Sequence, residues 1–190
     1  MARPPRYIAD VVPTGTLTAE ELGRIQLPNK RTELVRGALV VREPAGYRHG
    51  EVAARLARIL GNHVEDGHLG RVLAAETGFT LARDPDTVRA PDAAFIRSER
   101  LPEPPPRGYA RLAPDLVVEV LSPDDRPGEV LAKVADWLNA GTRLVWVVDP
   151  ERRQARVYRA DGSESLWTDS GTLDGEDVVP GFRCDLAAVL

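Results

Sequence analysis

A glutamate stands in the middle of an apolar stretch, PDLVVEVLSP, at residues 114–123. In a strand, Leu116, Val118 and Val120 would face one side of the sheet and Glu119 would face the other side. Apolar residues on both faces are typical of a strand inside a sheet. A buried carboxylate without a partner is costly, so Glu119 must be paired, protonated or bound to a cation. An ion pair with a buried arginine is one explanation, and a metal site is another.

Three other carboxylates stand at positions that favour strands, namely Glu33 in ELVRGALV, Asp92 in APDAAFI and Asp115 beside the glutamate strand. Two carboxylates from adjacent strands can meet at one edge of a sheet and offer oxygen ligands to Mg²⁺. This arrangement is the minimum for metal-assisted hydrolysis of a phosphodiester. Asp115 is also a candidate ligand, although an aspartate at the entry to a strand more often bonds backbone amides.

The elements that must position these side chains are a mixture of strands and helices. Helical periodicity and capping signals predict helices over 18–26, over 47–66 and after Ser122, the last closed by Gly141. Strands are predicted at 32–35, 38–43, 71–76, 78–82, 93–96, around Glu119, at 142–150, and in a C-terminal hairpin and closing strand within 153–190. The glutamate strand, the helix after it and strand 142–150 form a βαβ crossover with parallel strands. The proline-rich segment 97–114 lacks periodicity and predicts a loop near the site.

Composition limits the class of protein. The chain has 190 residues, 43% of them hydrophobic and 28% charged, which favours one soluble globular domain over residues 1–190. No apolar run reaches the length of a membrane span and no secretory signal core is present, so we expect a cytoplasmic protein without a membrane partner. The single Cys184 excludes an internal disulfide. A net charge of −4 counts against a sequence-tolerant DNA binder, but a metal in an acidic pocket would reverse the local sign.

Six short blocks resemble the Uma-two family of bacterial restriction endonucleases, within the PD-(D/E)xK restriction-endonuclease-like superfamily. In order along the chain they are ELVRGALV, His49-Gly50, APDAAFI, PDLVVEVLSP, KVADWLNAG and WVVDP. The resemblance implies an α/β restriction-endonuclease-like core over about 31–150, with a mixed central β-sheet flanked by helices. An N-terminal β-hairpin and a C-terminal β extension complete the expected fold.

The resemblance also implies roles for particular residues. Asp92 and Glu119 correspond to the carboxylates that hold Mg²⁺ or Mn²⁺ in the superfamily. The catalytic lysine usually follows two residues after the second carboxylate, where this chain has Leu121. Some members carry that lysine on the next helix, where this chain has Lys133, one of only two lysines among its 25 basic residues. A solvated lysine on an amphipathic helix is the alternative.

Two further residues are candidates for the site. Glu33 matches an early glutamate of the family and could complete the carboxylate shell or position water, but it could equally be a surface charge of the hairpin. His49, at the start of the long helix, could contact a phosphate or donate a proton. A contact at the N-terminal cap of the helix is the alternative for His49.

These observations predict a Mg²⁺-dependent endonuclease that hydrolyses nucleic acid, with DNA as the first candidate substrate, by means of a water activated by the metal. The missing lysine at position 121 and the acidic pI favour an alternative, a catalytically inactive nuclease-like fold that serves as a binding or assembly module. An enzyme acting on a small phosphorylated ligand is a third hypothesis. A homodimer would suit cleavage of both strands. We predict that Asp92 and Glu119 lie close enough to share a cation, with the Lys133 nitrogen near Glu119.

Overall fold

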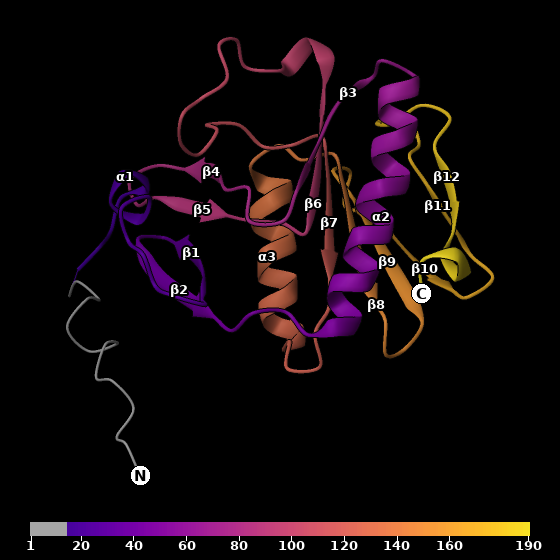
Figure 1. Ribbon diagram of the computed structural model, residues 1–190, viewed down its shortest axis with the longest axis horizontal. Coiled ribbons are helices and arrows are strands. Elements are labelled where there is room, and N and C mark those ends of the chain that lie inside the picture. The colour runs from indigo at the N-terminus through magenta and orange to yellow at the C-terminus, as the bar shows by residue number, and fades with distance from the viewer. Residues whose placement is uncertain (1–14) are drawn as a thin grey trace.

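The computed structural model describes residues 15–190 and is built around a mixed six-stranded sheet (Figure 1). The strand order is β10-β9-β8-β7-β6-β3. Their bounds are β3 Gly70–Ala74, β6 Ala93–Arg97, β7 Leu116–Val120, β8 Leu144–Asp149, β9 Gln154–Arg159 and β10 Glu164–Thr168. β7 and β8 are parallel, with Leu116 opposite Leu144, and the other neighbouring pairs of this sheet are antiparallel. The predicted α/β class, mixed sheet and βαβ crossover are thereby confirmed.

A second sheet of four strands carries the N-terminal hairpin, in the order β2-β1-β5-β4. Its strands are β1 Arg31–Val35, β2 Ala38–Arg42, β4 Phe79–Ala82 and β5 Thr87–Arg89. Arg36 and Gly37 form the hairpin turn with positive φ angles of 49° and 78°, as a two-residue turn between twisted strands requires. A side chain at Gly37 would also collide with Thr16, because an added Cβ would lie 2.2 Å from its Cγ2. The sequence did not predict β5, a strand of only three residues.

The helices agree with the sequence except at the N-terminus. α2 spans Tyr47–Asp66 as predicted, and α3 spans Pro127–Asn139. α1 covers only Ala19–Leu22, so the predicted helix over 18–26 is too long. Thr18 and Glu21 form a capping box at its start, but Gly23, a poor helix former, ends the helix after one turn. Two short 3-10 helices, η1 and η2, cover Ser98–Arg100 and Leu186–Ala188.

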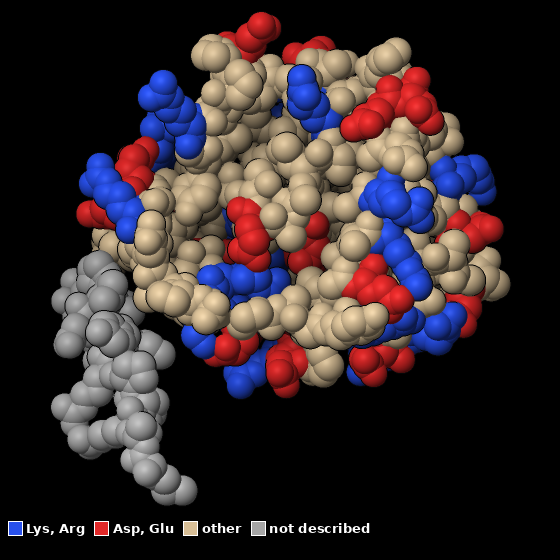
Figure 2. All heavy atoms as spheres, viewed as in Figure 1, with Lys and Arg blue, Asp and Glu red and all other residues tan. Residues whose placement is uncertain are grey.

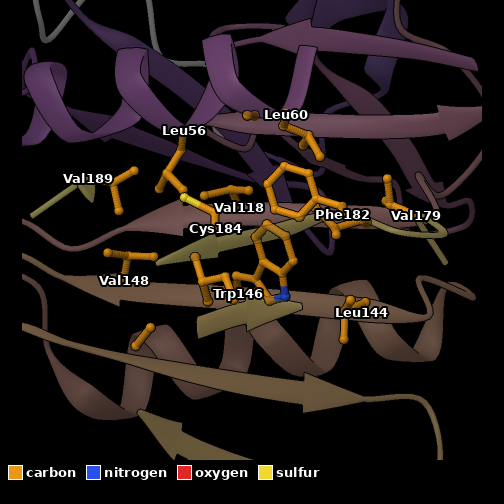
Figure 3. Close-up of a cluster of buried hydrophobic side chains, with 14 of the residues drawn as sticks. Leu56, Leu60, Val118, Leu144, Trp146, Val148, Val179, Phe182, Cys184 and Val189 are labelled. Carbon is orange, nitrogen blue, oxygen red and sulfur yellow. The ribbon is translucent and has the colours of Figure 1, made fainter. Parts of the chain in front are cut away.

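The central strands β6, β7 and β8 of the large sheet are buried on both faces, because α2 and α3 pack on opposite sides of the sheet (Figure 1). The α2 face includes the C-terminal segment with β11 Thr172–Asp174 and β12 Arg183–Asp185, which pair with each other in a separate two-stranded sheet. Figure 3 shows this core, in which the rings of Trp146 and Phe182 lie 5.5 Å apart. Within residues 15–190, no helix is long and apolar enough to cross a membrane.

The alternation along β7 turns Glu119 away from this core. Leu116, Val118 and Val120 belong to the cluster beneath α2, whereas Val117 belongs to the cluster beneath α3. Glu119 therefore faces α3, as its spacing from Val117 requires. β7 ends towards the side of the molecule where both α2 and α3 begin (Figure 1), and residues of the β1–β2 hairpin line the same cavity as the end of β7. Four separate elements thus meet around the carboxyl end of one buried strand.

Candidate functional site

One cavity at this meeting point is lined by five of the six candidate residues from the sequence: Glu33, His49, Asp92, Glu119 and Lys133. They come from β1, the first turn of α2, the residue before β6, the end of β7 and the middle of α3. Glu33, His49, Asp92 and Glu119 are all buried, so the cavity is built from buried polar groups. Polar groups buried in this way need partners within the fold.

Glu119 is paired through both of its carboxylate oxygens. Lys133 Nζ donates to Oε2 at 2.8 Å, and the Trp137 indole Nε1 donates to Oε1 at 2.8 Å. The prediction that the Lys133 nitrogen lies near Glu119 is confirmed, and the alternative of a solvated lysine is wrong. Trp137 is fully buried, and the sequence does not indicate its hydrogen bond to Glu119, because a tryptophan in an apolar helical stripe is typical of a core residue.

The charges of Glu119 and Lys133 depend on each other. Burial raises the pKa of the Glu119 carboxyl, Lys133 opposes that rise, and the carboxylates of Asp92 and Glu33 add to it. Burial alone would lower the pKa of Lys133, but Glu119 and Glu33 outweigh it and raise this pKa above its ordinary value. Lys133 therefore stays protonated, and its positive charge keeps a crowded set of carboxylates tolerable in a buried place.

Glu33 is part of this network rather than a surface charge of the hairpin. Its Oε1 lies 3.2 Å from Lys133 Nζ and accepts the Ala90 amide at 2.9 Å, while Oε2 accepts from Arg89 Nη1 at 3.0 Å. Lys133 and Arg89 overcome the effect of burial and lower the pKa of Glu33. Arg89, only 5% exposed, also donates to Asp136 at 2.6 Å. A buried arginine thus exists, but its partners are Glu33 and Asp136.

Asp92 joins β6, β7 and α2. Its Oδ2 accepts the Val120 amide at 2.7 Å and lies 3.2 Å from Nε2 of His49, and its Oδ1 lies 3.8 Å from Nη1 of Arg31. His49 therefore contacts Asp92, and the residue at the N-cap of α2 is Gly46. The other ring nitrogen of His49, Nδ1, is buried and has no hydrogen-bond partner within the described residues.

Asp92 and Glu119 are the residues that could hold a metal. Both are carboxylates at the carboxyl end of β7, and their hard oxygen ligands suit Mg²⁺ or Mn²⁺. Within residues 15–190, no three His, Cys, Asp or Glu side chains form a group that could hold a metal ion. The donor set fits a cation that keeps several waters and takes only one or two protein carboxylates. That the two carboxylates share one cation stays a prediction.

Asp115 lies at the opposite end of β7 and has a structural role. Its Oδ2 accepts the Arg97 amide at 3.0 Å, and its Oδ1 accepts from Arg100 Nη1 at 2.6 Å. This agrees with the interpretation that an aspartate at a strand entry bonds backbone amides. The loop over 97–114 lies at this end too, and none of its residues lines the cavity, so the expected position near the site is wrong.

An Asp115→Asn protein is expected to lose about 1–3 kcal/mol of unfolding free energy, because Arg100 loses its charged partner. Urea unfolding would measure this loss. The same protein is expected to bind Mn²⁺ as the parent does, since Asp115 is remote from Asp92 and Glu119. A drop in Mn²⁺ affinity with the fold intact would make Asp115 a ligand after all.

A comparison with protein families matches the Uma2 model, described as "Putative restriction endonuclease", over residues 19–187. No curated protein matches the chain significantly. Among solved structures, a "putative nuclease belonging to DUF820" from Anabaena variabilis ATCC 29413 is similar, with a TM-score of 0.79 and 19% sequence identity. The match covers 91% of this chain and 97% of that chain. At this level of identity the likeness shows a shared fold.

Proposed function

Because the chain belongs to the Uma2 family, whose model covers residues 19–187, we propose that it is a divalent-metal-dependent endonuclease acting on nucleic-acid phosphodiesters. The observation that supports this function most strongly is the meeting of Asp92, Glu119 and Lys133 in one cavity, with Lys133 Nζ 2.8 Å from Glu119. Two carboxylates can hold the cation, and an ammonium beside them can stabilise the charge that develops on the phosphate during hydrolysis.

Asp92 and Glu119 would hold the cation, Mg²⁺ or Mn²⁺. When bound, such an ion activates water for attack on phosphorus and neutralises charge on the phosphate. The hydrogen bond from the Val120 amide fixes the Asp92 carboxylate against β7, and His49 restrains the same oxygen. Trp137 restrains Glu119 in the same way from α3. These contacts orient both ligands before any substrate arrives, which reduces the cost of assembling the site.

Lys133 would replace the lysine that is missing at position 121. It reaches the site from α3, and its Nζ lies near three acceptors: Glu119 at 2.8 Å, Glu33 at 3.2 Å and the Ala90 carbonyl at 3.3 Å. An ammonium has three N–H donors, so a phosphate oxygen must exchange with one of these acceptors to contact Lys133. Glu33 would then keep Lys133 in place while the ammonium stabilises the charge that develops on the phosphate.

A catalytically inactive binding module is the second candidate function. In the described residues, Lys133 already offsets the charge of Glu119, and no group of three or more potential metal ligands is formed. A protein that had lost its metal would retain an ion pair of this kind as part of its core. A measurement of metal binding distinguishes the endonuclease from the inactive binding module, because the module does not need a cation at Asp92.

We expect the protein to cleave at least one of three substrates, namely single-stranded DNA, duplex DNA and RNA, in Mg²⁺ or Mn²⁺ but not in EDTA. Gel electrophoresis of end-labelled strands would detect the products. An Asp92→Asn protein purified in the same way is expected to be inactive, which controls for a contaminating nuclease. Equal cleavage by the parent and by Asp92→Asn, or no cleavage of any substrate together with no metal binding, would contradict the proposed function.

A further inference from the structure

Two arginines stand directly opposite each other at the open end of the β1–β2 hairpin. In the register of these strands Arg31 pairs with Arg42, and Glu33 pairs with Val40. Residues two apart on a strand, and partners across an antiparallel pair, share one face. Arg31, Arg42 and Glu33 therefore share a face, and all three line the candidate site. Like charges directly opposite each other are unfavourable in a sheet unless anions lie between or beside them.

The anions that hold Arg42 lie on the opposite wall of the cavity. Its Nη2 donates to Glu129 at 3.0 Å, and its Nη1 lies 3.7 Å from Asp125. Glu129 belongs to the first turn of α3, and Asp125 to the connection between β7 and α3. Both acidic residues also line the cavity. The ion pairs of Arg42 thus connect the hairpin to α3 across the site.

Arg31 is held more loosely. Its Nε donates to the Glu43 carbonyl at 3.2 Å, and its nearest carboxylate oxygen, on Asp92, is 3.8 Å away from Nη1. The side chains of Arg31 and Arg42 are 29% and 36% exposed, respectively. Both guanidinium groups are therefore accessible from solvent and retain N–H donors for an incoming anion.

The charges of the cavity wall make these arginines necessary for any phosphate ligand. The lysines and arginines of the wall are Arg31, Arg42 and Lys133. They are outnumbered by its acidic residues, which are Glu33, Glu76, Asp92, Glu119, Asp125 and Glu129. On the face shown in Figure 2, acidic and basic side chains are interspersed and no large basic area is present. A polyanion would thus depend on a few specific contacts, and the planar guanidinium group matches the geometry of phosphate oxygens.

We propose that Arg31 and Arg42 bind a backbone phosphate of the nucleic acid at the edge of the candidate site, and that Glu129 and Asp125 hold Arg42 until the phosphate replaces them. The naming of nucleic acid as the ligand rests on the proposed function. Glu129 and Asp125 are competitors for Arg42 in this proposal, so their removal should strengthen binding. A purely structural ion pair predicts no such gain.

The test measures binding of fluorescein-labelled 30-nucleotide DNA, single-stranded and duplex, by fluorescence anisotropy in Ca²⁺ at several KCl concentrations. Arg42→Ala and Arg31→Ala are each expected to weaken binding about tenfold, as the loss of one charged hydrogen bond implies. The slope of log Kd against log salt should fall by about 0.7–0.9 for each lost phosphate contact. Glu129→Gln is expected to tighten binding about threefold, because an exposed carboxylate competes only weakly.

Arg143→Ala provides the matched control. Arg143 is 39% exposed, pairs with a single carboxylate, Asp177, at 2.6 Å, and does not line the cavity. The Arg143→Ala protein should bind DNA with the same affinity as the parent at every salt concentration. The inference would be overturned by unchanged affinity and salt slope in Arg42→Ala, or by weaker binding in Glu129→Gln. It would also be overturned if the parent bound neither single-stranded nor duplex DNA. If the arginine variants lose DNA binding but the parent neither cleaves any substrate nor binds metal, the phosphate site stands and the proposed hydrolysis falls.

Discussion

The Glu119→Gln protein is expected to lose cleavage by more than about a hundredfold and to lose measurable Mn²⁺ binding. Changing a residue that merely orients a metal ligand costs about 10–100-fold in metal affinity or activity, so removing the charge of a ligand should cost more. Glutamine preserves the shape of Glu119 within the core. Isothermal titration with Mn²⁺ and a cleavage assay would measure the two losses.

The fold of Glu119→Gln is expected to survive. A glutamine has one acceptor oxygen where the carboxylate has two, so either Lys133 or Trp137 loses its partner, at a cost of about 1–3 kcal/mol. Relief of repulsion from Asp92 and Glu33 offsets part of that loss. Glu176→Gln is a suitable control, because Glu176 forms an ion pair with Arg159, at an N–O distance of 2.8 Å, and neither residue lines the cavity. Retained Mn²⁺ affinity in Glu119→Gln would contradict the ligand assignment, and an unfolded protein would make Glu119 a purely structural group.

Local patterns were enough to predict the elements that carry the site. The apolar stripe of α2 predicted its bounds, Tyr47–Asp66, and period-two alternation placed Glu119 on the face opposite Val118. The position of Lys133 followed from the handedness of the crossover, because a right-handed βαβ unit brings the first turns of its helix beside the end of the first strand. The sequence could therefore predict contacts within one supersecondary unit.

Contacts between distant segments could not be predicted in the same way. Arg89 reaches Glu33 and Asp136 only because β5 pairs with β1, and a strand of three residues has too little periodicity to be detected. In a chain with 25 basic residues, of which all but two are arginines, Arg89 also carries no compositional signal. The Trp137 hydrogen bond was missed for a related reason, since a helical stripe shows which face is buried but not which buried polar atom lies opposite.

The Lys133→Met protein is expected to lose about 3–5 kcal/mol of unfolding free energy in metal-free buffer, since breaking a buried ion pair leaves its carboxylates uncompensated. Chemical unfolding would measure this loss. Lys30→Met is a closely matched control, because the Lys30 side chain is 24% exposed and that of Lys133 is 22% exposed. The side chain of Glu43, the partner of Lys30, is 77% exposed, whereas the side chain of Glu119 is 10% exposed. The control should lose no more than about 1 kcal/mol.

Adding Mg²⁺ or Mn²⁺ is expected to raise the melting temperature of Lys133→Met more than that of the parent. A cation at Asp92 and Glu119 would supply the positive charge that the variant lacks, and a ligand that binds only the folded state stabilises it.

Cleavage by Lys133→Met should stay lost when metal is added, because methionine cannot stabilise charge on the phosphate. Lys133→Arg should restore little cleavage, because a planar guanidinium is bulkier than the ammonium. If Lys133→Met is too unstable to purify, the Lys133→Met/Glu119→Gln double variant should recover stability without any response to metal. Equal metal-induced shifts in Lys133→Met and the parent would show that the cation does not bind among these carboxylates, and parental cleavage by Lys133→Met would remove the lysine from the mechanism.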